Sequence, residues 1–88
     1  MTARIYYLPI PRKGFVDTSL VEVRKRAMTY MARTGVTSMT VYRSSTKKNP
    51  VGMVVYEPGW RSNFIWCYNT GGRVQEAPIL SDGNIRRS

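Results

Sequence analysis

One stretch of this 88-residue chain has the periodicity of a helix, and residues at both of its ends mark where it begins and stops. Ser19 followed by Glu22 predicts a capping box, in which the serine oxygen accepts an N–H of the first turn and the glutamate reaches back to the serine N–H. Gly35 predicts the helix end, because glycine adopts the left-handed conformation found there without strain. One face is built from residues at helical spacing: Leu20, Val23, Ala27, Tyr30, Met31 and Thr34. We therefore expect a helix over residues 19–34 whose apolar face must be covered by another element.

The rest of the chain alternates with the period of β-strands. The expected strands are residues 3–8, 36–43, 51–57, 64–68 and 73–77. The last four follow one another through short turns and so predict an antiparallel meander, whereas Pro9 favours the sheet edge for the first strand. The element order β-α-β-β-β predicts a single small α+β domain, with the helix on one face of the sheet.

Length and charge limit both the organisation of the chain and its partners. We expect one domain over residues 1–78, followed by a mobile or loosely packed basic tail over residues 79–88. Fourteen Lys and Arg against five Asp and Glu give a net charge of +9, mostly from arginine, whose planar guanidinium suits phosphates and bases. The excess favours nucleic acid as the partner over an anionic membrane surface or an acidic protein, although a basic chain without such a partner has the same composition.

The location is expected to be cytoplasmic. No apolar run approaches the roughly 20 residues that span a bilayer, so no membrane partner is expected. Cys67 is the single cysteine and cannot form a disulfide within the chain, which favours a reducing compartment. We interpret Cys67 as a small core-facing strand residue, not as a reactive thiol.

Alternation over residues 64–68 raises the question of which sheet face the helix covers. A consistent partition places the aliphatic set beneath the helix: Met39, Val41, Val51, Met53, Val55, Ile65 and Cys67. The aromatic set then lies on the open face: Tyr42, Tyr56, Phe64, Trp66 and Tyr68. Strand register is not encoded in such a pattern, and a slip of one residue reverses the contribution of a strand.

An open aromatic face has three explanations. It is a stacking surface for bases, with each base contributing roughly 1–3 kcal/mol. It is a protein interface, because Tyr, Trp and Arg are enriched in interface hot spots. Or the aromatic rings are the true core, or lie beneath the C-terminal residues 78–88.

Cations in neighbouring loops favour the first explanation, because a single-stranded nucleic acid needs basic residues beside its stacking surface. The candidate site for nucleic acid or a partner comprises Tyr42, Arg43, Lys47, Lys48, Tyr56, Arg61, Phe64, Trp66, Tyr68 and Arg73. A second, separable basic surface on the helix comprises Lys25, Arg26 and Arg33, although a solvent-facing helix side has the same pattern. Binding of duplex through the sheet remains open.

The composition argues against an enzyme. The chain has no histidine, its five carboxylates follow no paired-acid or metal-ligand spacing, and neither a cofactor nor a metal is expected. We therefore expect a small basic nucleic-acid-binding protein with modest sequence preference. The alternative is an adaptor or inhibitor of phage or mobile-element type that docks onto a larger host protein or nucleoprotein complex, such as a nuclease. A further alternative is homodimerisation through the aromatic face.

Overall fold

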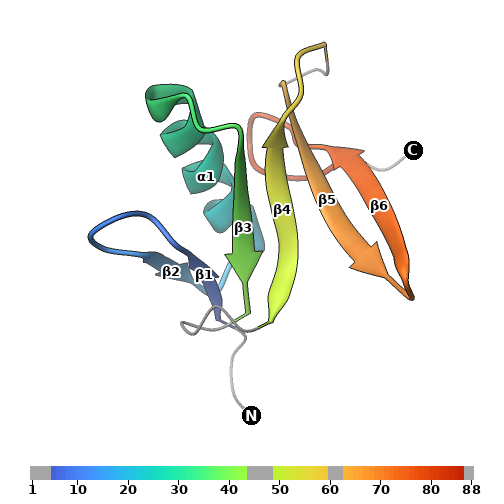
Figure 1. Ribbon diagram of the computed structural model, residues 1–88, viewed down its shortest axis with the longest axis horizontal. Coiled ribbons are helices and arrows are strands. Elements are labelled where there is room, and N and C mark those ends of the chain that lie inside the picture. The colour runs from blue at the N-terminus through green and yellow to red at the C-terminus, as the bar shows by residue number, and fades with distance from the viewer. Residues whose placement is uncertain (1–4, 44–48, 60–62, 87–88) are drawn as a thin grey trace.

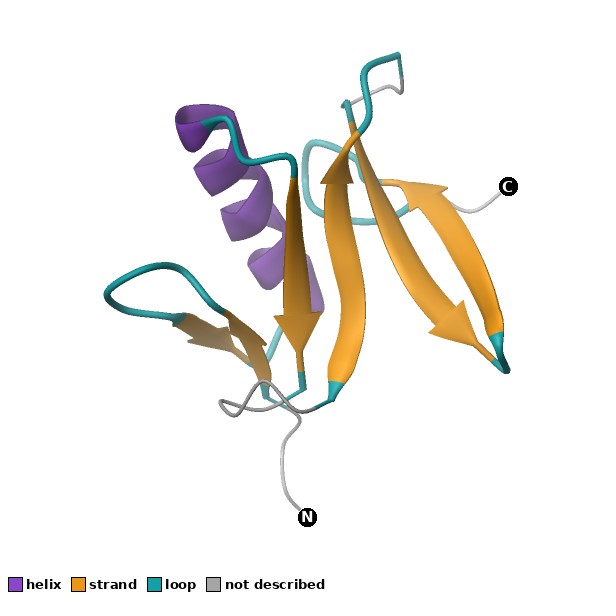
Figure 2. Cartoon of the chain, viewed as in Figure 1, coloured by secondary structure: helices purple, strands orange, loops and turns teal. Residues whose placement is uncertain are grey.

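The computed structural model describes residues 5–43, 49–59 and 63–86, which form one helix on a six-stranded antiparallel sheet (Figures 1 and 2). The helix is α1 (Leu20–Thr34), and the strands are β1 (Tyr6–Leu8), β2 (Phe15–Asp17), β3 (Ser38–Tyr42), β4 (Pro50–Tyr56), β5 (Phe64–Thr70) and β6 (Arg73–Pro78). The expected α+β fold and the antiparallel meander are confirmed. Within the described residues, no helix is long and apolar enough to cross a membrane.

The first part of the sheet differs from expectation. The strand order is β2-β1-β3-β4-β5-β6, so β1 has a neighbour on each side and the prediction of an edge position is wrong. Its second neighbour, β2, was not expected, because a strand of only three residues carries no readable period. Pro9 and Pro11 follow β1 in the loop of the β1–β2 hairpin, where they interrupt no hydrogen bond of the ladder.

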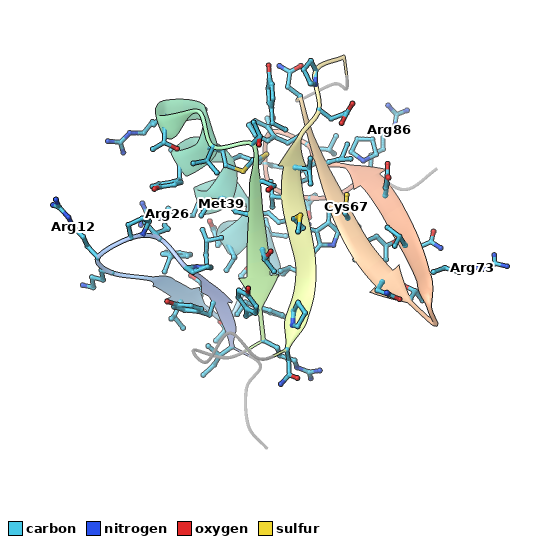
Figure 3. All side chains as sticks on the ribbon, viewed as in Figure 1. Arg12, Arg26, Met39, Cys67, Arg73 and Arg86 are labelled. Carbon is cyan, nitrogen blue, oxygen red and sulfur yellow. The ribbon has the colours of Figure 1, made fainter. Side chains whose placement is uncertain are left out.

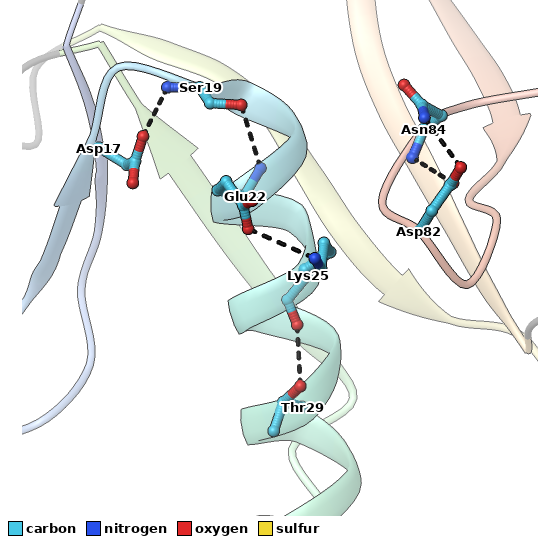
Figure 4. A network of polar contacts seen from close by, with 7 residues as sticks. All are labelled: Asp17, Ser19, Glu22, Lys25, Thr29, Asp82 and Asn84. Atoms are coloured by element: carbon cyan, nitrogen blue, oxygen red, sulfur yellow. Dashed lines mark hydrogen bonds and ion pairs between the residues drawn. The ribbon is translucent and has the colours of Figure 1, made fainter.

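Both ends of α1 follow local rules, although the first turn uses a different acid from the one expected. The Ser19 hydroxyl accepts the N–H of Glu22 at 3.4 Å, as predicted. The Ser19 N–H, however, donates to Asp17 at 2.8 Å, while the Glu22 carboxylate pairs with Lys25 at 3.5 Å (Figure 4). At the other end Gly35 has a φ of 80° and donates back into the last turn at 2.9 Å, as the αL ending requires.

The core lies between α1 and one face of the sheet. Its buried members are Leu8, Val23, Ala27, Met31, Met39, Val41, Val54, Phe64, Trp66 and Ile79. The prediction of which side chains face the helix is therefore confirmed for β3 and wrong for β4 and β5. On β4 and β5 the core is formed by Val54, Phe64 and Trp66, and not by the alternate residues of each strand. Ile65 is also buried, but it lies outside this cluster.

Strand register explains the reversal. Val54 lies opposite Met39 on one side and opposite Trp66 on the other, so these three side chains share a face. Burying the indole removes more apolar surface from water than burying Cys67 would. Gly52 makes room for the indole, because a Cβ at that position would collide with the Trp66 ring.

The C-terminal segment, residues 79–86, packs into the domain and is not the loosely packed tail expected. Ile79 is fully buried, and its N–H donates to the Phe64 carbonyl at 3.0 Å. Leu80 and Asn84 close a turn, with a hydrogen bond of 2.7 Å between the Leu80 N–H and the Asn84 carbonyl. The expected boundary at residue 78 is therefore wrong, because the residues that follow it also pack against the domain.

Candidate nucleic-acid interface

The aromatic residues of the predicted site do not form an open stacking surface. Phe64 and Trp66 keep only 9% and 3% of their surface exposed, beneath α1. Tyr56 is 42% exposed and packs edge-on against Phe64, with the ring centroids 5.6 Å apart. Tyr42 and Tyr68 are half-buried. The expectation that the helix leaves the aromatic face open is wrong, because two of its five rings belong to the core.

One face of the Trp66 ring is occupied by a buried arginine of the helix. The Arg24 guanidinium carbon lies 5.0 Å from the indole centroid, and the side chain donates to the Gly83 carbonyl at 2.7 Å. Burial lowers the pKa of the Arg24 guanidinium. The stack therefore links α1, β5 and the C-terminal segment, which gives Trp66 a structural role.

Of the five cations expected around the sheet face, the structure describes two, Arg43 and Arg73. Arg43 directly follows β3 and Arg73 begins β6; both are exposed. Lys47, Lys48 and Arg61 lie outside the described residues. In Figure 3, Arg73 projects from the end of the molecule opposite Arg12 and Arg26.

The predicted basic surface of α1, in contrast, borders a hollow region. Three hollows of about 620, 360 and 230 Å³ lie along α1 and the β1–β2 hairpin, and Arg26 contributes to all three. Arg33 lines the second and Lys25 the third. We call this region the hairpin–helix groove and define it by Ile10, Lys13, Phe15, Arg26, Tyr30 and Arg33.

Arg26 is held in place by an aromatic ring. Its guanidinium carbon lies 4.7 Å from the centroid of the Phe15 ring, an arrangement that leaves the N–H edges of the guanidinium free to donate. Among the described residues, Arg26 forms no ion pair, whereas the charge of Lys25 is partly compensated by Glu22. Arg26 is therefore the best-placed anion receptor of the groove.

The tip of the β1–β2 hairpin adds a further cation. Arg12 is exposed and has a φ of 76°, the left-handed conformation that costs a residue with a Cβ about 1–2 kcal/mol. Lys13 follows it and lines the groove. The sequence pattern did not place Arg12 and Lys13 in a site, because the groove becomes visible only once Phe15–Asp17 is recognised as a strand that folds the loop back toward α1.

Most carboxylates near α1 have structural partners. Asp17 and Glu22 hold the first turn of the helix, as described above. Asp82 accepts the backbone and side-chain N–H groups of Asn84, each at 3.0 Å, and these bonds lower the pKa of Asp82 (Figure 4). Within the described ranges, no group of three or more His, Cys, Asp or Glu could hold a metal ion.

The sheet face away from α1 carries a shallow hollow of about 270 Å³. Its apolar lining includes Met53 and Val74, which are 37% and 70% exposed, together with the half-buried Cys67. Cys67 thus faces away from the helix, contrary to expectation. Burial raises the pKa of the Cys67 thiol above its ordinary value, and the negative charges of Glu76 and Glu57 raise it further.

This raised pKa predicts slow alkylation of Cys67. Because the thiolate is the reacting form, iodoacetamide should reach its half-maximal rate at a higher pH in the folded protein than in the urea-unfolded chain. Glu76→Gln should lower the pH of half-maximal rate in the folded protein, since it removes one negative charge near the thiol. Glu22→Gln, on α1, is the control and should leave the profile unchanged. Identical profiles for folded and unfolded protein would contradict the prediction.

The described surface thus offers two hollow regions on opposite sides of the sheet. The hairpin–helix groove is cationic, and the hollow opposite α1 is apolar with carboxylates nearby. Comparisons with protein-family models, with curated proteins and with solved structures found no match for this chain.

Proposed function

We propose that the protein binds nucleic acid through the hairpin–helix groove, mainly by contacts to phosphates, and that it acts as a binding protein and not as an enzyme. The observation that carries this proposal is the position of Arg26. It is stacked on Phe15, lacks a carboxylate partner among the described residues, and lies where the three hollows meet. A planar guanidinium fixed in this way presents two parallel N–H donors to a phosphate.

The surroundings of Arg26 support a polyanion over a single small anion. Lys13 approaches from the hairpin and Arg33 from the last turn of α1, so cations border the groove along its length. Arg12 at the hairpin tip extends the row. A solvated helix surface also carries Lys and Arg, but it needs neither an aromatic support for one arginine nor a strained arginine in the facing loop.

A salt titration with labelled probes tests the proposal. Fluorescence anisotropy of single-stranded DNA, duplex DNA and RNA is measured between 50 and 200 mM salt. If Lys13, Arg26 and Arg33 each neutralise one phosphate, the logarithm of affinity should fall with a slope of about −2 to −3 against the logarithm of salt concentration. The affinity should therefore drop about 15- to 60-fold across this fourfold range of salt concentration.

Undetectable binding to every probe at low salt would overturn the proposal. If the protein then retained a partner protein after nuclease treatment, the adaptor or inhibitor function would be favoured instead. In that case the exposed apolar hollow opposite α1, with Met53 and Val74, is the surface to mutate first.

A further inference from the structure

The hairpin–helix groove is divided into two neighbouring compartments. The hollows of about 620 and 360 Å³ have two residues in common, Ile10 and Arg26, which form the wall between them. Both volumes fall within the range of about 300–1,000 Å³ that is usual for ligand pockets. Two adjoining compartments with a shared wall suit a ligand made of two linked units.

Each compartment combines an apolar wall with a cation. The first has as its apolar wall Val16 and the part of the Phe15 ring that Arg26 leaves uncovered, and Lys13 is its cation. The second has Tyr30 as its wall and Arg33 as its cation. A nucleotide has the same two parts, since its base is flat and largely apolar on its faces while its phosphate is anionic.

We propose that the groove holds two consecutive nucleotides of an unpaired strand, with one base in each compartment and the linking phosphate on Arg26. This inference rests on the proposed function and narrows its ligand to single-stranded nucleic acid. Arg26 lines both compartments, and one face of its guanidinium is stacked on the Phe15 ring. In the proposed arrangement its free N–H groups therefore donate to the phosphate that links the two bases. Lys13 and Arg33 then contact the flanking phosphates.

A duplex does not satisfy this arrangement. Its bases are stacked and paired in the interior, so only its phosphates would reach the cations at the rim, and the apolar walls would stay uncovered. A polyphosphate of equal charge has no base at all. The two-compartment site therefore predicts discrimination between ligands that simple attraction to positive charge does not provide.

Competition against a labelled single-stranded oligonucleotide tests the inference. The competitors are the 5′-phosphorylated thymidine dinucleotide, its ribonucleotide equivalent, thymidine monophosphate and inorganic tripolyphosphate. The dinucleotides should compete at concentrations at least about tenfold lower than either other competitor, and unlabelled duplex should compete more weakly than unlabelled single strand. A difference between the two dinucleotides would show whether the 2′-hydroxyl is read.

Two variants connect the discrimination to Arg26. Arg26→Lys keeps the charge but loses the planar group that stacks on Phe15, so it should keep tripolyphosphate competition and lose the preference for dinucleotides. Arg86→Lys, the same substitution in the C-terminal segment, should change neither. Amide NMR shifts on adding the dinucleotide should fall on Lys13, Arg26 and Arg33 and spare Arg73.

The possible failures are distinguishable. Equal competition by dinucleotide and tripolyphosphate would overturn the two-nucleotide site while leaving phosphate binding in the groove intact. NMR shifts confined to residues outside the groove would overturn the site as well. Absence of any binding at low salt would overturn the proposed function and this inference together.

Discussion

Trp66→Ala is expected to lower the free energy of unfolding by about 3–5 kcal/mol, the usual cost of removing a buried aromatic side chain. The indole is 3% exposed, belongs to the core cluster beneath α1, and supports the buried Arg24 guanidinium. Domains of this size are stable by only about 5–15 kcal/mol, so the variant should unfold at a much lower urea concentration or fail to fold. Urea denaturation followed by circular dichroism measures the change.

An exposed side chain on a neighbouring strand gives the matched control. Val74 on β6 is 70% exposed, and Val74→Ala should change the free energy of unfolding by less than about 0.5 kcal/mol. If Trp66→Ala kept the native urea midpoint and instead weakened nucleic-acid binding, the indole would have to be accessible to the ligand. That result would contradict the burial of Trp66 beneath α1. It would instead support the open aromatic face that the alternation of residues 64–68 predicts.

The double variant Arg26→Ala, Arg33→Ala is expected to weaken single-strand affinity about 100-fold at low salt. Each arginine is assigned one phosphate contact, and a charge-assisted hydrogen bond lost at an accessible site costs about 1.4 kcal/mol, or tenfold. The salt slope should fall in magnitude by about 1.4–1.8, because two fewer phosphates are neutralised on binding and fewer counterions are released. Stability should change little, since both side chains are exposed.

A charge-matched control separates position from net charge. The double variant Arg73→Ala, Arg86→Ala also removes two positive charges, but from the end of the molecule opposite Arg12 and Arg26 (Figure 3). Its affinity should fall by no more than about threefold through long-range attraction. Equal losses in the two double variants would show that binding depends on total charge, and would remove the groove from the mechanism.

The elements that are decided locally could be predicted from the sequence. Ser19 and Gly35 bounded α1 because capping depends on a few adjacent residues, and the four strands of the meander were found from alternation and short turns. Strand β2 was not predicted, because three residues are too few to show the alternation of a strand. Without it, the loop holding Arg12 and Lys13 was not recognised as one wall of a groove.

The buried face of the sheet could not be predicted, because it depends on contacts between strands. Alternation gives two sets of side chains per strand but does not say which set faces the helix. The pairing of Val54 with Trp66, and the space left by Gly52, decide the matter, and both involve residues distant in sequence. The basic helix surface was identified more easily, because Lys25, Arg26 and Arg33 share one element and its geometry is fixed by the helical repeat.

The fit of the Trp66 indole over Gly52 also constrains how this fold can diverge. The Trp66 ring fills the space that a side chain at residue 52 would occupy. A methyl group gained at residue 52 must therefore be compensated by a smaller side chain at residue 66. A descendant chain would have to pass through an unstable intermediate or acquire both changes at once. We therefore expect any homologues to vary at these two positions as a pair, large with small, whichever ligand their grooves have come to prefer.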